Sequence, residues 1–167
     1  ENRIAYACLS DRTHTSILND FCELMNYRPI TFQATDPNDL PIYHTNVMMA
    51  LGEKYVVICL ESISDPDEVA QLRKAFQITG KELIEISFDQ VQSFAGNMLQ
   101  LKTAAGHPLL VMSQQAYDSL LPEQIDKLKK HNPILSAPIS NIERVGGGSA
   151  RCMIAEIFLP AMRNSTA

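Results

Sequence analysis

The amino-acid sequence predicts an α/β fold made of repeated strand–strand–helix–strand (ββαβ) units. Short apolar runs typical of strands alternate with longer segments whose apolar residues recur at helical spacing. Two such units follow each other at 45–87 and 98–139, and a partial unit stands at each end. No linker or low-complexity tract interrupts this order, so residues 1–167 are expected to form a single domain segment. In a circular array of such units, the loops at one end of the strands meet at the centre.

The partial unit at the beginning predicts a strand, a helix and a second strand. Residues 4–9 form an apolar run that ends at the turn 10–13. Residues 13–26 have the apolar spacing of an amphipathic helix. Residues 29–34 return as a strand, and the turn-forming residues of 36–41 predict a loop.

The first complete unit begins with two strands, 45–50 and 55–60, which a tight hairpin joins. A helix follows from Pro66 at its first position, and Gly80 ends it. Residues 83–87 are the returning strand.

The second complete unit has the same order. Paired strands are predicted at 98–101 and 108–112, and helices at 114–120 and 122–131. Residues 134–139 form the returning strand.

The chain's most distinctive stretch is a run of three glycines, Gly146–Gly148, followed by Cys152. Without Cβ atoms, this backbone can take positive φ and approach a ligand closely. The apolar run 153–159 predicts a strand that Pro160 stops. Cys152 is therefore expected at the lip between a flexible loop and a strand, where a nucleophile is exposed yet held. For these residues alone, a structural turn with a small buried cysteine is the more common arrangement.

Composition excludes several functional classes. The chain is 46% hydrophobic and 20% charged, which is typical of a globular domain, and its net charge of −5 argues against nucleic acid or an anionic membrane as a partner. No signal peptide or membrane-spanning run is visible. The four cysteines are far apart and lack zinc-site spacing, so we expect reduced thiols in the cytoplasm and no metal.

Three polar residues near predicted strand ends are candidates for a site, although each has an ordinary structural interpretation. His44 directly precedes a strand, Arg12 follows one and suits a carboxylate, and Asn97 lies in a predicted turn. The remaining histidines, His14, His107 and His131, are expected to be solvated.

Four motifs taken together resemble those of one enzyme superfamily. They are Ser10–Thr13, His44–Asn46, Phe94–Asn97 and Gly146–Met153. In this order they are similar to motifs of the guanidino-group-modifying superfamily, which includes arginine deiminase, dimethylarginine dimethylaminohydrolase and the amidinotransferases. The longer runs 41–49 and 146–160 look most like the citrulline-utilisation hydrolase branch. The resemblance covers the whole chain but only the C-terminal portion of such a protein.

That resemblance implies a fold and a set of site residues. The fold is a five-bladed ββαβ propeller (pentein) with its active site in the central channel, of which this chain supplies about three blades. Cys152 matches the nucleophile, His44 the general acid/base and Arg12 a ligand of the substrate's α-carboxylate, and Asn46 and Asn97 match substrate-binding positions. The family also uses a glutamate in a glycine-rich motif. Nothing here matches it, so that segment either lies upstream of residue 1 or is lacking.

The implied activity is hydrolysis of a carbon–nitrogen bond, other than a peptide bond, through a cysteine-bound intermediate and without a cofactor. Arginine deiminases carry an aspartate where this chain has the neutral Asn46, which favours the neutral ureido group of citrulline, converted to ornithine, over arginine. An arginine deiminase, an amidinotransferase and an inert binding or assembly module are the alternatives. The expected partners are an amino-acid substrate and either a second copy of the chain or the remainder of the same protein.

Overall fold

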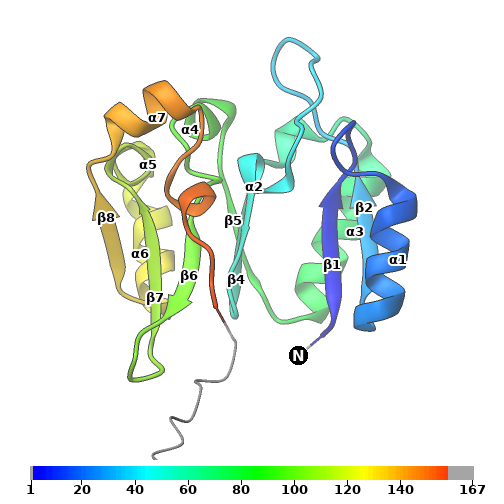
Figure 1. The fold of residues 1–167 in the computed structure, drawn as a ribbon, viewed down its shortest axis with the longest axis horizontal. Coiled ribbons are helices and arrows are strands. Elements are labelled where there is room, and N and C mark those ends of the chain that lie inside the picture. The colour runs from blue at the N-terminus through cyan, green and yellow to red at the C-terminus, as the bar shows by residue number, and fades with distance from the viewer. Residues whose placement is uncertain (1, 158–167) are drawn as a thin grey trace, which may run out of the picture.

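The strands of this protein form three separate sheets, as the repeated units predict, and not one open sheet. The structure is a computed structural model that describes residues 2–157. One sheet has two strands, and the other two have three strands each. Figure 1 shows the three sheets standing side by side in chain order. The predicted α/β class is confirmed, and the described part does not close into a barrel.

The first sheet pairs β1 (Ile4–Cys8) with β2 (Arg28–Phe32) in parallel. Parallel neighbours need a crossover connection, and α1 (Thr15–Met25) provides it. The helix packs against β2 and buries Cys22. Its predicted apolar spacing is present, but Ile17 and Leu24 remain 67% and 83% exposed.

The second sheet follows the predicted ββαβ order. β3 (Met49–Leu51) and β4 (Tyr55–Ile58) form the expected hairpin, and β5 (Glu82–Glu85) pairs with β4 in parallel. Between β4 and β5 run a short 3₁₀ turn, η1 (Leu60–Ser62), and the helix α3 (Pro66–Ile78). Asp65 accepts a hydrogen bond from the Asp67 N–H and so caps α3.

The third sheet repeats this topology. β6 (Leu99–Lys102) is antiparallel to β7 (Pro108–Ser113), and β8 (Ile134–Ala137) is parallel to β7. Two helices, α5 (Gln114–Ser119) and α6 (Pro122–His131), make the crossover. α4 (Phe88–Gln92) connects the second sheet to the third, and α7 (Ser140–Gly146) with η2 (Ala150–Met153) follows β8.

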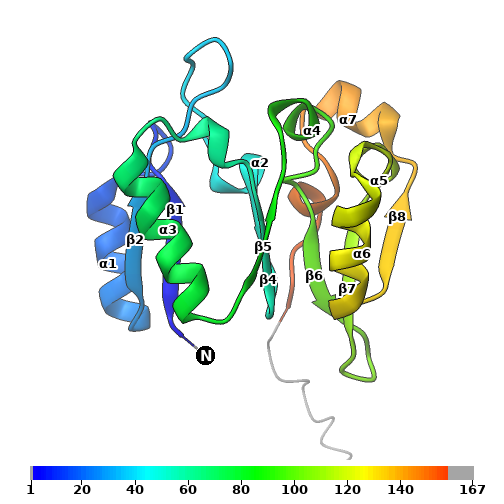
Figure 2. The same cartoon turned by 180° about the vertical axis from the view of Figure 1, so that it is seen from behind.

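The crossover helices α3 and α6 lie on the face of the sheets opposite to η2. Figure 1 shows η2 in front of β6 and β7, and Figure 2, from behind, shows α3 and α6 in front of the strands. One face of the second and third sheets is therefore covered by a helix, as expected for propeller units. Within residues 2–157, no helix combines the length and the apolar character that crossing a bilayer requires.

Buried polar side chains join the second unit to the third. The Tyr55 hydroxyl on β4 donates to Asn132 Oδ1 at 3.0 Å, and Gln100 Nε2 on β6 donates to the same oxygen at 2.7 Å. His131 Nε2 lies 2.8 Å from Glu82 Oε2, and its ring stacks on Tyr55. The expectation that His131 is merely solvated was therefore wrong, because the end of α6 lies against the neighbouring unit.

Several local predictions differ from the structure. Residues 45–48, expected to begin a strand, form the helical turn α2 (Thr45–Met48), in which the Val47 N–H donates to the His44 carbonyl. The short helices α4 and α7 were not predicted. Ser87 and Gln90 form a capping box at the start of α4, and this sequence pattern is typical of a helix N-terminus.

The C-terminal prediction was also wrong where it can be compared. Cys152 and Met153 lie in the 3₁₀ turn η2, and residues 154–157 belong to no strand because they pair with none in the described part. Residues 158 and 159 of the predicted strand lie outside the described residues. The glycine run is no open loop either. Gly146 ends α7, and Gly147, at φ 68°, is the left-handed residue that caps it.

Gly96 packs closely against the backbone of α2. A Cβ atom there would overlap the backbone oxygen of Val47 and lie 2.9 Å from the Met48 backbone. We predict that Gly96→Ala lowers the free energy of unfolding by about 1–3 kcal/mol, because rigid backbone must move to admit the methyl group. Gly146→Ala is the matched control, since nothing lies within 4 Å of its added Cβ. Urea denaturation measures both, and equal stability of the two variants would contradict this packing.

Candidate active site

The candidate nucleophile, Cys152, lies on η2 with an exposed side chain. The Asn97 side chain contacts it twice. Asn97 Nδ2 donates to Cys152 Sγ at 3.1 Å, and the Cys152 N–H donates to Asn97 Oδ1 at 3.4 Å. Asn46 Nδ2 is a second, longer donor, 3.8 Å from the sulfur. Two amide groups therefore direct N–H bonds toward the sulfur.

Asn97 is held in place by the turn between α4 and β6. Its N–H donates to the Phe94 carbonyl at 2.9 Å, and Phe94 itself has a positive φ of 63°. The side chain is 3% exposed, and Nδ2 also donates to the backbone oxygen of Asn46 at 2.9 Å. One carboxamide thus joins the α2 segment to η2.

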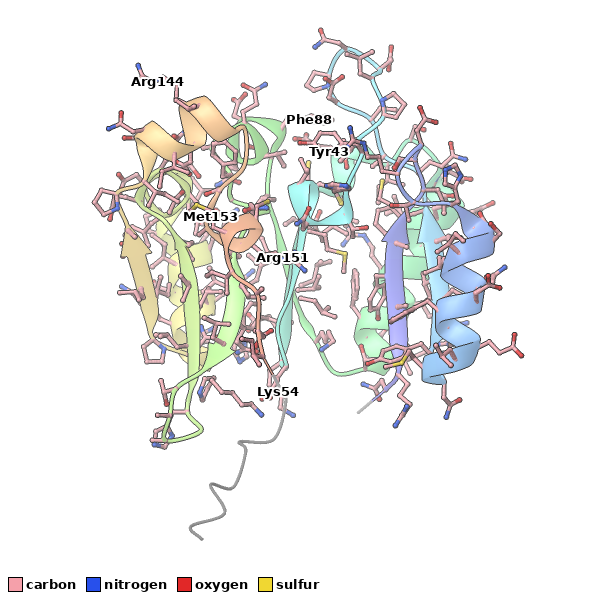
Figure 3. All side chains as sticks on the ribbon, in the orientation of Figure 1. Tyr43, Lys54, Phe88, Arg144, Arg151 and Met153 are labelled. Carbon is pink, nitrogen blue, oxygen red and sulfur yellow. The ribbon has the colours of Figure 1, made fainter. Side chains whose placement is uncertain are left out.

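His44 and Arg12 gather around Tyr43. The His44 ring lies 4.8 Å from the Tyr43 ring, edge to face, and the Arg12 guanidinium lies 6.0 Å from the centre of the same ring. Ser10 Oγ donates to the Tyr43 carbonyl at 2.8 Å and fixes this part of the chain to the turn after β1. Figure 3 shows Tyr43 toward the same end of the strands as Met153, the neighbour of Cys152.

The structure brings the predicted residues into two contacting groups. Asn46, Asn97 and Cys152 touch one another directly. Arg12 and His44 are linked through Tyr43, and His44 directly precedes α2, which carries Asn46. Among the described residues, no hydrogen bond joins His44 to the thiol. That contact therefore stays a prediction.

A cavity of about 200 Å³ lies beside the contacting group formed by Asn46, Asn97 and Cys152. Asn46 and Arg151 line it together with side chains from β1, β3 and β6. Asn46 Oδ1 is buried and accepts no hydrogen bond from the described residues. Sequence reasoning missed Arg151 and Tyr43. Their positions next to Cys152 and His44 were the signals that pointed to them.

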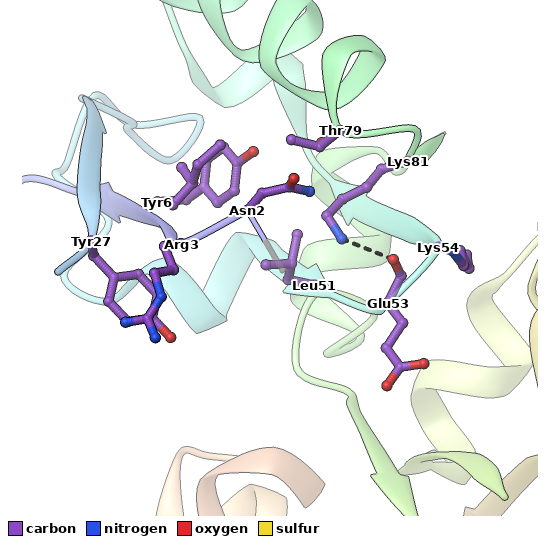
Figure 4. Close-up of a pocket in the computed structure, with 10 residues that line it drawn as sticks. Asn2, Arg3, Tyr6, Tyr27, Leu51, Glu53, Lys54, Thr79 and Lys81 are labelled. Atoms are coloured by element: carbon purple, nitrogen blue, oxygen red, sulfur yellow. Dashed lines mark hydrogen bonds between the residues drawn. The ribbon is translucent and has the colours of Figure 1, made fainter. Parts of the chain in front are cut away.

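A larger cavity, of about 370 Å³, lies elsewhere. Lys54, Lys81 and Tyr6 are among the residues that line it (Figure 4). It lies where β1, β4 and β5 begin, whereas Met153, the neighbour of Cys152, lies toward the other end of the strands (Figure 3). Within residues 2–157, no group of three histidine, cysteine, aspartate or glutamate side chains is placed to hold a metal ion.

The other three thiols differ from Cys152 in burial. Cys8 and Cys59 are 0% exposed and Cys22 is 3% exposed. Burial raises the pKa of the Cys8 thiol, and it raises the pKa of Cys59 to about 11. Cys59 lies just after β4, not inside the strand as expected.

We predict that a small alkylating agent at neutral pH modifies Cys152 well before the other cysteines, because only its thiol is exposed. Peptide mass spectrometry of iodoacetamide-treated protein measures the order. Cys59 is expected to react only as the pH nears its pKa of about 11 or as the protein unfolds. Equal labelling of all four thiols in the folded protein would remove the nucleophile assignment.

Solved structures show the same fold. The apo arginine dihydrolase ArgZ, from the ornithine–ammonia cycle of cyanobacteria, superposes with a TM-score of 0.68 at 14% identity, covering 90% of this chain and 22% of that one. Its N-terminal domain with product bound gives a TM-score of 0.67 at 14% identity, covering 90% of this chain and 50% of the domain. AgrE in complex with ornithine and NAD⁺ gives 0.66 at 14% identity, covering 97% of this chain and 22% of AgrE.

These structures establish the pentein fold for this chain, which spans at most half of each of them. The predicted guanidino-group-modifying superfamily is confirmed, and the citrulline branch stays a prediction. Comparison with curated proteins finds no significant match. The family model described as eukaryotic N,N-dimethylarginine dimethylhydrolase matches residues 1–159. The chain therefore belongs to the N,N-dimethylarginine dimethylhydrolase family.

Proposed function

We propose that this chain carries the nucleophile of a hydrolase that cleaves a carbon–nitrogen bond at the guanidino or ureido carbon of an arginine-like amino acid. One observation carries the proposal. The exposed thiol of Cys152 accepts a hydrogen bond from Asn97 and lies beside Asn46, whose side-chain oxygen has no partner among residues 2–157. A sulfur that accepts a hydrogen bond, next to an amide oxygen that could accept one from a ligand, suits attack on a guanidino or ureido carbon, whose nitrogens carry N–H groups. Family membership supports the same chemistry.

The reaction runs in two steps. The Cys152 thiolate adds to the central carbon, and the carbon–nitrogen bond to the leaving amine breaks as His44 gives that nitrogen a proton. A carbon–sulfur bond then joins substrate and enzyme. In the second step His44 takes a proton from water, the resulting hydroxide adds to the carbon, and the thiolate leaves. Each cycle consumes one water and restores both residues.

Binding of the substrate is divided between the two contacting groups. Arg12 is exposed next to Tyr43 and suits the α-carboxylate, since a guanidinium binds a carboxylate through two parallel hydrogen bonds. Asn46 Oδ1 accepts an N–H from the reacting group. Because an amide is neutral, it suits a ureido group and also a methylated guanidino group whose charge is met by another acid.

Two substrates have specific support. Membership of the family favours N,N-dimethylarginine, which would release dimethylamine and leave citrulline. The neutral Asn46, with its free oxygen, favours citrulline, which would leave ornithine. The exposed Cys152 is less in keeping with an inert module, and an amidinotransferase differs in passing the group to an amine instead of water.

We predict that Cys152→Ser abolishes turnover, because a neutral hydroxyl is a far weaker nucleophile, and that His44→Ala lowers kcat by about 10²–10⁴-fold with little change in substrate binding. The assay incubates the 167-residue protein with N,N-dimethylarginine, citrulline and arginine in turn. Dimethylamine, ornithine and ammonia are measured separately, so the product identifies the substrate.

Arg144→Ala is the control, since Arg144 is exposed on α7 and its side chain donates a hydrogen bond to the nearby Asn141. Unchanged turnover by the Cys152→Ser protein would refute the mechanism. Turnover that requires an added amine would identify a transferase. Absence of binding of any of the three compounds would favour the assembly module.

A further inference from the structure

Glu143 on α7 is a buried carboxylate in contact with the segment that leads to Cys152. It is 4% exposed, and its Oε1 accepts a hydrogen bond from Ser149 Oγ at 2.6 Å. Ser149 is 0% exposed. The other carboxylate oxygen of Glu143, Oε2, is buried and has no hydrogen-bond partner among the described residues. No ion pair neutralises this side chain within residues 2–157.

The hydrogen bond between Glu143 and Ser149 joins α7 to the residue that directly precedes η2. The Glu143 carbonyl accepts the N–H of Gly147 at 3.0 Å, and its carboxylate accepts the hydroxyl of Ser149. The Ser149 carbonyl in turn accepts the N–H of Cys152 at 3.0 Å. A continuous chain of hydrogen bonds therefore runs from α7 through Ser149 to the backbone of the nucleophile.

The position of Cys152 leaves little room for movement of this segment. A Cβ atom on Gly148 would lie 3.1 Å from Cys152 Cβ and 3.4 Å from its sulfur, so the Gly148 backbone is already close to the Cys152 side chain. On the other side, Asn97 holds both the Cys152 N–H and Sγ. A shift of Ser149 would therefore change the hydrogen bond between Asn97 Nδ2 and the thiol.

Stability of the fold alone does not account for Glu143. Burial of a carboxylate with one hydrogen bond and one unpaired oxygen is unfavourable compared with an apolar side chain of similar size. The end of α7 is already capped by Gly147, which donates to a backbone carbonyl and needs no side chain. The carboxylate adds only its bond to Ser149, so the position of Ser149 is what it determines.

We propose that Glu143 is a positioning residue, acting through Ser149, that sets the nucleophilic sulfur of Cys152 against the Asn97 amide. The inference about catalysis rests on the function proposed above. The reactivity of the thiol, however, is measurable whether or not that function is correct.

The experiment compares Glu143→Ala, Ser149→Ala, the double variant and Glu143→Gln in the 167-residue protein. The rate at which iodoacetamide modifies Cys152 at neutral pH is measured by peptide mass spectrometry. The values of kcat and KM are measured on whichever of N,N-dimethylarginine, citrulline and arginine the protein turns over. Urea denaturation reports stability, and Arg144→Ala is the control on the same helix.

We expect Glu143→Ala and Ser149→Ala each to slow alkylation of Cys152 by about tenfold, as loss of a hydrogen bond to a charged group would. The double variant should be no slower than either single one, because all three lack the same contact. Glu143→Gln keeps an acceptor oxygen and should restore most of the rate. Turnover should fall through kcat, with KM nearly unchanged.

Wild-type alkylation rates in both alanine variants, with reduced stability alone, would overturn the proposal, as would losses that simply multiply in the double variant. If Glu143→Ala does not fold, Ser149→Ala, which removes a single oxygen, decides the question by itself. Slowed alkylation in a protein that turns over no substrate would support the positioning role and refute the proposed function.

Discussion

The carboxamide of Asn97 is the interaction on which the site depends. Its Nδ2 donates both to the Asn46 carbonyl and to Cys152 Sγ, and its Oδ1 accepts the Cys152 N–H. These contacts join Asn97 to Asn46, about fifty positions earlier in the sequence, and to Cys152, about fifty positions later. The side chain is almost fully buried, so the hydrogen bonds form with little competition from water. Without them, the longer contact from Asn46 Nδ2 to the sulfur would be the one hydrogen bond among the described residues that joins the thiol to α2.

The repeat explains why these residues meet. Asn46 lies just before β3 and Asn97 just before β6, the first strands of successive units. Cys152 follows β8 at the corresponding place after the second complete unit. Units arranged side by side bring such equivalent positions to one end of the strands. The architecture therefore supplies the proximity, and the side-chain types supply the chemistry.

Sequence reasoning was accurate where local chemistry decides the structure. Helix α3 begins with a capping aspartate and a proline, and the hairpin and crossovers followed from apolar spacing. It failed where tertiary contacts decide. The Cys8 N–H donates to Thr45 Oγ1, and α2 forms at a segment whose composition favours a strand. The residues after Cys152 read as a strand but have no partner strand in residues 2–157.

For the candidate site, ordered motifs were sufficient to select Cys152, Asn46 and Asn97, which the structure places in contact. They could not reveal Glu143, because a glutamate in a short helix looks like a surface residue until the fold buries it. They also could not reveal Tyr43 as the ring between Arg12 and His44, since that role exists only in three dimensions.

The most direct test of the account is a search for the covalent intermediate. The 167-residue protein, mixed with N,N-dimethylarginine or citrulline and quenched in acid within the first turnover, is analysed by intact and peptide mass spectrometry. The account predicts a mass increase on the peptide that contains Cys152, matching a substrate-derived group bonded to sulfur, and none in the Cys152→Ser variant. An adduct on another residue, or turnover of substrate with no adduct at any time, would contradict it.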